Sequence, residues 1–152
     1  MDQNNQKLAV RLGFAALAPF VLLTLLCWIV HPDWLGYFIR GQLYYGLAIL
    51  SFLGGLHWGV IMKGDHGNHE ETRKALIWGV TPTLLGWASM INMGLGFVMQ
   101  VVGFALAYRF DKQRYQQQNL PDWFLHLRLQ MTRVVISAQL FTLLAANLRH
   151  YS

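Results

Sequence analysis

The chain of 152 residues is rich in apolar side chains and poor in charged ones, at 55% hydrophobic and 12% charged. Soluble domains carry about 25% charged residues, so a soluble fold of this length would lack polar surface. The net charge of +5 does not point to nucleic acid, because the basic residues flank apolar runs and do not share one polar face. The composition predicts an all-α integral membrane protein, organised as a single domain over residues 1–152.

Five apolar stretches are predicted to cross the bilayer as helices. The first resembles a signal peptide, but it exceeds the roughly 7–15 residues of a signal's apolar region and lacks a small-residue cleavage site, so we expect it to be retained. The third and fourth are joined only by "NMG", which predicts a tight helical hairpin. The polar stretch "RFDKQRYQQQNLPD" is expected to form a loop or a surface-lying segment. The predicted spans cover residues 8–30, 41–62, 75–91, 95–108 and 125–148.

Lysine and arginine gather on one side of this five-span bundle. Because cationic loops stay in the cytoplasm, the pattern predicts a cytoplasmic N-terminus and a periplasmic C-terminus. The absence of an Arg- and Ser-rich transit segment favours a bacterial chain in the inner membrane. Ten of the twelve cations lie on the predicted inner side and two, Arg40 and Arg149, on the outer side; the ten are Lys7, Arg11, Lys63, Arg73, Lys74, Arg109, Lys112, Arg114, Arg128 and Arg133.

Acidic residues are expected only outside the spans. Ion-coupled transporters and proton pumps commonly place a carboxylate at membrane depth, so this distribution counts against both classes. The single cysteine, Cys27, excludes an intrachain disulfide and is expected to be a small buried apolar residue.

The stretch "SFLGGLHWG" places a histidine inside the second span. Ser51, Gly55 and Gly59 are spaced by four and form a ridge of small residues, which allows two membrane helices to approach closely. Because each residue of a helix is rotated by about 100° from the one before it, His57 points away from that ridge. A polar side chain in hydrocarbon needs a partner, and two interpretations stay open for His57: a hydrogen bond to another helix, or contact with a ligand.

Four further residues are candidate companions of His57 at similar depth. Arg133 shares a stripe with Gln130 in the fifth span, and Trp58 and Trp78 could wall a pocket open to the inner leaflet. Such a pocket would suit a quinone or an anionic lipid. Snorkelling of the arginine to the interface and an aromatic belt explain the same residues equally well.

Three other positions are assigned to helix packing. Gly96 and Gly103 lie on one stripe with Gln100, which could form an inter-helix hydrogen bond. Pro82 removes a backbone donor inside the third span and leaves the Trp78 carbonyl as a potential acceptor.

Metal and catalytic chemistry have little support in the sequence. His66, His69 and Glu70 form a conceivable weak metal cluster, but a solvated loop explains them better. Haem is not expected, because no second histidine lies at the depth of His57. No Ser, His and carboxylate arrangement indicates an intramembrane hydrolase, and no glycine loop followed by lysine indicates phosphate binding.

Three motifs, "YYGLAILSFLGGLHWG", "ALIWGVTPTLLGWASM" and "PDWFLHLRLQMTRVVIS", resemble those of an uncharacterised bacterial multi-span membrane family, to which the mitochondrial transmembrane protein 69 is similar. The resemblance covers roughly residues 12–137 and implies a small inner-membrane protein without an assigned activity. It places the family's recurring positions at Gly54, Gly55, His57, Trp58, Gly59, Trp78, Pro82, Arg128 and Thr132.

The function expected from these patterns is that of a small non-enzymatic accessory or assembly subunit of a larger membrane complex, with a respiratory complex as one candidate. Its expected partners are membrane lipids and either other integral membrane proteins or a second copy of the chain, not nucleic acid. The alternative is an intramembrane binding module for a quinone or an anionic lipid, at a cytoplasmic-side pocket around His57 and Arg133. Enzymatic activity is a weaker third interpretation.

Overall fold

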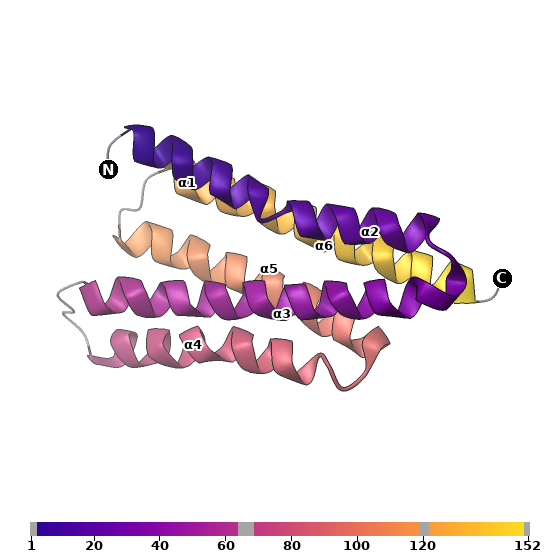
Figure 1. Cartoon of the computed structure of the whole chain (residues 1–152). Helices are drawn as coiled ribbons and strands as arrows, with labels where there is room; N and C mark the ends of the chain where they lie inside the picture. Colours follow the sequence, from indigo (N-terminus) through magenta and orange to yellow (C-terminus); the bar gives the residue numbers. More distant parts are fainter. Residues whose placement is uncertain (1–2, 64–68, 119–121, 151–152) are drawn as a thin grey trace. The chain divides into compact units, whose positions relative to one another are not determined.

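The computed structural model describes residues 3–63, 69–118 and 122–150, and these residues are almost entirely helical (Figure 1). Within the described ranges there is no strand, so the predicted all-α class is confirmed. The helices are α1 (Gln3–Ala15), α2 (Ala18–Ile29), α3 (Pro32–Lys63), α4 (His69–Ala88), α5 (Met93–Gln118) and α6 (Asp122–His150).

The first predicted span is a pair of helices, α1 and α2, with a break at Ala16 and Leu17. Pro19 stands in the first turn of α2, where its missing N–H costs nothing but prevents one continuous hydrogen-bond ladder. The Leu17 N–H instead donates to the Phe14 carbonyl, 3.0 Å away, which tightens the last turn of α1.

The polar stretch after the fourth span, for which the sequence predicts a loop or a surface-lying segment, begins as a continuation of helix α5. α5 continues without a break through "RFDKQRYQQQ" to Gln118, so residues 109–118 belong to the same helix as the apolar stretch before them. Arg, Lys and Gln are good helix formers, and the segment contains no glycine or proline before Pro121. Polarity alone does not separate a loop or a surface-lying segment from a polar helix that continues beyond an apolar one.

Three helical segments among the described residues are long and apolar enough to cross a membrane: Gln3–Ile29, Met93–Gln113 and Asp122–Arg149. They correspond to the predicted first, fourth and fifth spans. The remaining two spans and the orientation stay predictions. The tight hairpin between the third and fourth spans is present, since α4 ends at Ala88 and α5 begins at Met93, with the Asn92 side chain accepting from the Leu95 N–H.

The chain divides into two compact units. The first unit comprises the described parts of Met1–Gln42 and Tyr108–Ser152, and the second unit comprises those of Leu43–Ala107. In the first unit α6 runs parallel to α1 and α2. Gly13 of α1 faces Leu127 and Met131 of α6, and further along the chain Thr24 of α2 contacts Ala138 of α6.

The second unit is held by the close approach of α3 and α4. A methyl group added to Gly54 would overlap the Gly79 carbonyl oxygen, and one added to Gly79 would overlap the Trp58 ring. The predicted ridge is therefore not the face of this contact: Gly55 and Gly59 have open space where a side chain would begin. Gly54 lies about 100° round the helix from Gly55, and spacing alone could not tell which of the two faces meets α4.

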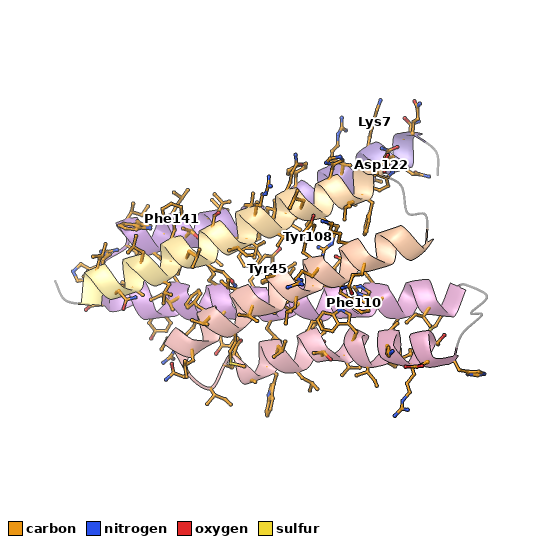
Figure 2. All side chains as sticks on the ribbon, turned by 180° about the vertical axis from the view of Figure 1, so that it is seen from behind. Lys7, Tyr45, Tyr108, Phe110, Asp122 and Phe141 are labelled. Atoms are coloured by element: carbon orange, nitrogen blue, oxygen red, sulfur yellow. The ribbon has the colours of Figure 1, made fainter. Side chains whose placement is uncertain are left out.

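The interior of the first unit contains polar side chains beside apolar ones, and much of its exterior is apolar, unlike a soluble bundle. On α6 the buried side chains include Arg128, Thr132, Gln139 and Thr142, whereas Leu140, Phe141, Leu144 and Leu148 are exposed. Figure 2 labels Phe141 on this exposed face. An apolar exterior of this kind is stable only against an apolar solvent. The packing thus agrees with the membrane environment predicted from composition.

Substitution of Gly54 by Ala should destabilise the protein by about 1–3 kcal/mol, because the new methyl group meets backbone atoms that cannot rotate away. Gly55→Ala is the matched control, one residue along in open space, and should leave stability unchanged or raise it by up to about 1 kcal/mol through helix propensity. Thermal unfolding of both purified variants in detergent measures the difference. Equal melting temperatures would contradict the α3–α4 contact.

Candidate functional site

A buried polar cluster joins three helices of the first unit. Thr142 Oγ1 on α6 donates to Gln42 Oε1 on α3 at 3.0 Å, and Gln42 Nε2 donates to Thr24 Oγ1 on α2 at 3.2 Å. The Thr24 hydroxyl lies 2.8 Å from the Phe20 carbonyl oxygen, which accepts its proton. Gln42 and Thr142 are fully buried. This chain of donors and acceptors is closed, so the cluster serves as a clamp between helices and not as an open site.

A second polar clamp lies inside the second unit. Gln100 Nε2 on α5 donates to the Leu43 carbonyl oxygen of α3 at 2.8 Å and to Ser89 Oγ at 3.0 Å. Ser89 in turn donates to the Gly86 carbonyl oxygen at 2.5 Å. The stripe predicted around Gln100 is buried, and a methyl group added to Gly96 would overlap the Ser89 carbonyl, while one added to Gly103 would touch Leu50. These contacts give Gln100 a structural role between helices.

An ion pair lies buried in the first unit between Asp111 of α5 and Arg128 of α6. The Arg128 Nε donates to Asp111 Oδ2 at 2.6 Å, Nη2 lies 2.5 Å from the same oxygen, and both side chains are 7% exposed. Asp111 stands just past the predicted end of the fourth span at residue 108, in α5 and not in a loop. Helix α5 continues past the predicted end, and the first turn of this extension holds the Asp111 carboxylate on a buried face.

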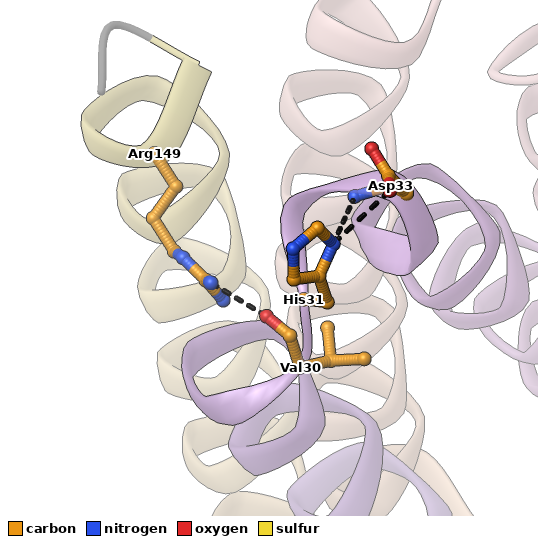
Figure 3. Close-up of polar contacts among 4 residues, drawn as sticks. All are labelled: Val30, His31, Asp33 and Arg149. Atoms are coloured by element: carbon orange, nitrogen blue, oxygen red, sulfur yellow. Dashed lines mark hydrogen bonds and ion pairs between the residues drawn. The ribbon is translucent and has the colours of Figure 1, made fainter.

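Arg149 closes the C-terminal end of α2 in the first unit (Figure 3). Its Nη1 donates to the Cys27 carbonyl oxygen at 2.8 Å and its Nη2 to the Val30 carbonyl oxygen at 2.5 Å. The last carbonyls of a helix have no partner within it and carry partial negative charge, so a cation is well placed there. Arg149 is thus engaged by a helix end, and it is not a loop cation of the kind that the orientation rule counts.

His57, Trp58 and Trp78 all lie in the second unit. His57 is half-buried, and its Nδ1 lies 2.8 Å from the Leu53 carbonyl oxygen one turn earlier on α3; because a carbonyl only accepts, Nδ1 carries the proton. Trp58 Nε1 donates to the Leu76 carbonyl oxygen on α4 at 3.1 Å, so this tryptophan covers the Gly54–Gly79 contact. Trp78 is half-buried on α4, and Pro82 is buried one turn later without ending that helix.

Arg133 and Gln130 lie in the first unit, both exposed on α6. Arg133 borders an open groove of about 330 Å³ between α2 and α6. The other lining residues are Val21, Thr24, Leu25, Val134, Ser137, Ala138 and Phe141. Among the described residues this arginine forms no ion pair, in contrast to Arg128.

The weak metal candidates do not form a described site. His66 lies outside the described residues, and His69 and Glu70 are exposed at the start of α4. Lys74 Nζ lies 2.7 Å from Glu70 Oε1, and this bonded cation holds the pKa of the Glu70 carboxyl below its ordinary value. Glu70 is therefore part of an exposed helix pair. No group of three metal-ligating side chains occurs in the part of the chain that the structure describes.

Four groups with clear structural roles were missed by sequence reasoning: Thr24, Gln42, Asp111 and Thr142. Thr24 and Gln42 stood out only as isolated polar residues in apolar surroundings, which is the signal that drew attention to His57. On α6 the spacing of Arg128, Thr132, Gln139 and Thr142, by four, seven and three, marks one helix face. Following that polar face would have indicated the buried side of α6.

Comparison with known proteins identifies the family of this chain. A family model described as "Protein of unknown function (DUF3429)" matches residues 5–144, which is nearly the whole chain. The chain belongs to this family. The resemblance drawn from the three sequence motifs is thereby confirmed. In this DUF3429 member, two of the positions attributed to the family, Gly54 and Trp58, make the α3–α4 contact, and a third, Arg128, forms the buried ion pair.

Two curated relatives carry the name Transmembrane protein 69. The protein from Xenopus tropicalis is 30% identical over 136 residues, which cover 86% of this chain and 51% of the relative. The Mus musculus protein is 25% identical over 154 residues, which cover 95% of this chain and 59% of the relative. The chain thus spans a little over half the length of these relatives. No solved structure matches it.

Removal of one partner of the ion pair should be costly. Arg128→Met leaves the Asp111 carboxylate buried without its cation and should destabilise the protein by about 3–5 kcal/mol. The double variant Asp111→Leu with Arg128→Met removes both charges and should recover most of that loss. Unfolding of the two variants in detergent provides the measurement. If the double variant were no more stable than Arg128→Met, the loss in the single variant would not come from breaking the ion pair.

Loss of the helix-end contact should also be measurable. Arg149→Met removes two charge-assisted hydrogen bonds to carbonyls at the C-terminal end of α2, and we expect a loss of about 1.5–3 kcal/mol. Arg40→Met, at an exposed arginine of α3 in the same unit, is the control and should change stability by less than about 0.5 kcal/mol. Hydrogen exchange should show the difference as faster exchange confined to the last turn of α2. An equal effect of both substitutions would contradict the capping role.

Proposed function

We propose that the protein is a non-enzymatic accessory or assembly subunit of a larger complex in a bacterial inner membrane. The proposal is supported by the use of its interior polar groups: the Thr24–Gln42–Thr142 cluster, the Gln100 clamp and the Asp111–Arg128 pair all join helices to one another. Groups committed to packing are suited to a scaffold. The membership of a transmembrane family fits the location.

The observation that carries the proposal is the small-residue ridge on α3. Ser51 bonds to the Leu47 carbonyl of its own helix at 2.9 Å, and Gly55 and Gly59 have open space at the position of a side chain. The glycine that the chain needs for its own packing is Gly54, on a different face. A ridge that allows close helix contact, and that the described chain leaves uncovered, suits the helix of another subunit.

The orientation proposed with this role places the N-terminus in the cytoplasm and the C-terminus in the periplasm, with five crossings. The contact of Arg149 with α2 supports it, because one of the two cations on the outer side then has a structural reason to be there. Arg40 is then the outer cation without such a reason, and the predicted inner side carries many more lysines and arginines.

A binding role is the second candidate function. Its support is the groove beside Arg133, which combines a cation with apolar walls. His57 and Arg133 belong to different units, so the binding role proposed from the structure uses Arg133 and its own unit alone, with Gln130 one turn before it.

The accessory role predicts that the ridge is needed for assembly. In mild detergent extracts of its native membrane, the protein should migrate in a complex larger than the monomer. Gly55→Leu and Gly59→Leu should release it as a folded monomer, because the larger side chain blocks close helix contact. Gly36→Leu, also on α3 and also in open space, is the matched control and should keep the complex.

Coexpression of two differently tagged copies identifies the partner as a second copy or another protein. A monodisperse monomer of the unsubstituted chain, or a complex that persists in the Gly55 and Gly59 variants, would overturn the accessory role.

A further inference from the structure

The groove between α2 and α6 has a polar end and an apolar end. Arg133 and Ser137 are one turn apart on α6, and Phe141 follows one turn later, about 12 Å from Arg133 along the helix axis. Val21 and Leu25 form the facing wall on α2. The volume of about 330 Å³ lies in the range of small-molecule sites, roughly 300–1,000 Å³.

The polar end faces the N-terminal end of α6. Side chains on a helix lean toward its N-terminus, so the Arg133 guanidinium reaches toward the turn that carries exposed Gln130. The N-terminal ends of α1 and α6 lie together in the first unit, and Figure 2 labels Lys7 and Asp122 there. The exposed cations Lys7 and Arg11 of α1 belong to this same end.

Charge decides which amphiphile fits the groove. Two arginines of α6 are already used, Arg128 by a buried carboxylate and Arg149 by helix carbonyls. Arg133 is exposed at the groove without an acidic partner among the described residues, so its positive charge is available. A phosphate anion pairs with a guanidinium through charge-assisted hydrogen bonds. A quinone carbonyl is neutral and has no such preference.

We propose that this groove binds one anionic phospholipid, with the phosphate at Arg133, the glycerol region beside Gln130 and Ser137, and part of one acyl chain along Val21, Leu25 and Phe141. The lipid enters from the leaflet at the N-terminal end of α6. That leaflet is the cytoplasmic one in the proposed orientation, where anionic lipids attract basic residues. The site is independent of the α3 ridge, so it stands or fails separately from the accessory role.

The test compares retention of two lipids by the purified full chain. The protein is exchanged into detergent with phosphatidylglycerol or phosphatidylcholine of identical acyl chains, and bound lipid is counted by native mass spectrometry. We expect retention of phosphatidylglycerol over phosphatidylcholine, and a drop of about fivefold in Arg133→Gln, the size of effect that one basic residue has at an anionic membrane surface. Arg40→Gln, an exposed arginine of the same unit outside the groove, should retain phosphatidylglycerol as the unsubstituted chain does.

A second variant tests the apolar part of the site without touching a charge. Val21→Phe fills the groove at a side chain that is already 42% exposed, and should reduce phosphatidylglycerol retention while the melting temperature stays unchanged. Equal retention of both lipids, or undiminished phosphatidylglycerol in Arg133→Gln and Val21→Phe, would overturn the proposal. Displacement of the lipid by free glycerol phosphate at equal concentration would also overturn it, since the site would then recognise the anion alone.

Discussion

Polar side chains inside a lipid-facing bundle must find their hydrogen-bond partners within the protein, and this constraint shapes the rest of the structure. Water is absent from the hydrocarbon, so an unpaired amide or hydroxyl there is costly. Thr24, Gln42 and Thr142 meet for that reason, as do Gln100 and Ser89. Many large apolar side chains, Phe141 and Leu144 among them, lie on the exterior, where they can face lipid.

The same constraint separates three arginines of α6 by role. Arg128 is compensated by Asp111, and Arg149 by the carbonyls that end α2. Both cations are therefore part of the architecture. Arg133 has neither kind of partner among the described residues and borders a groove with apolar walls. A cation that packing does not use is a better candidate for an external ligand than one that holds two helices together.

Particular residues show where the sequence was a sufficient guide and where it was not. The hairpin at "NMG" and the buried stripe around Gln100 follow from local signals, a short linker and a helical spacing, and both are present. The length of α5 did not follow from the sequence, because a polar segment can be a loop, a surface-lying segment or the continuation of a helix. The face of α3 that meets α4 did not follow from spacing, because Gly54, Gly55 and Gly59 all permit close approach and only the position of α4 selects Gly54.

The sequence by itself determined the solvent and the class of fold, because apolar content, charge scarcity and helical spacing act locally along the chain. It also identified the family, through three motifs spread over most of its length. Only the tertiary structure decided which polar residues meet, since Asp111 and Arg128, or Thr24 and Thr142, come from separate helices whose rotation no single helix specifies. Which residues pair depends on the rotation of each helix about its own axis, and this rotation is fixed only when the helices pack together.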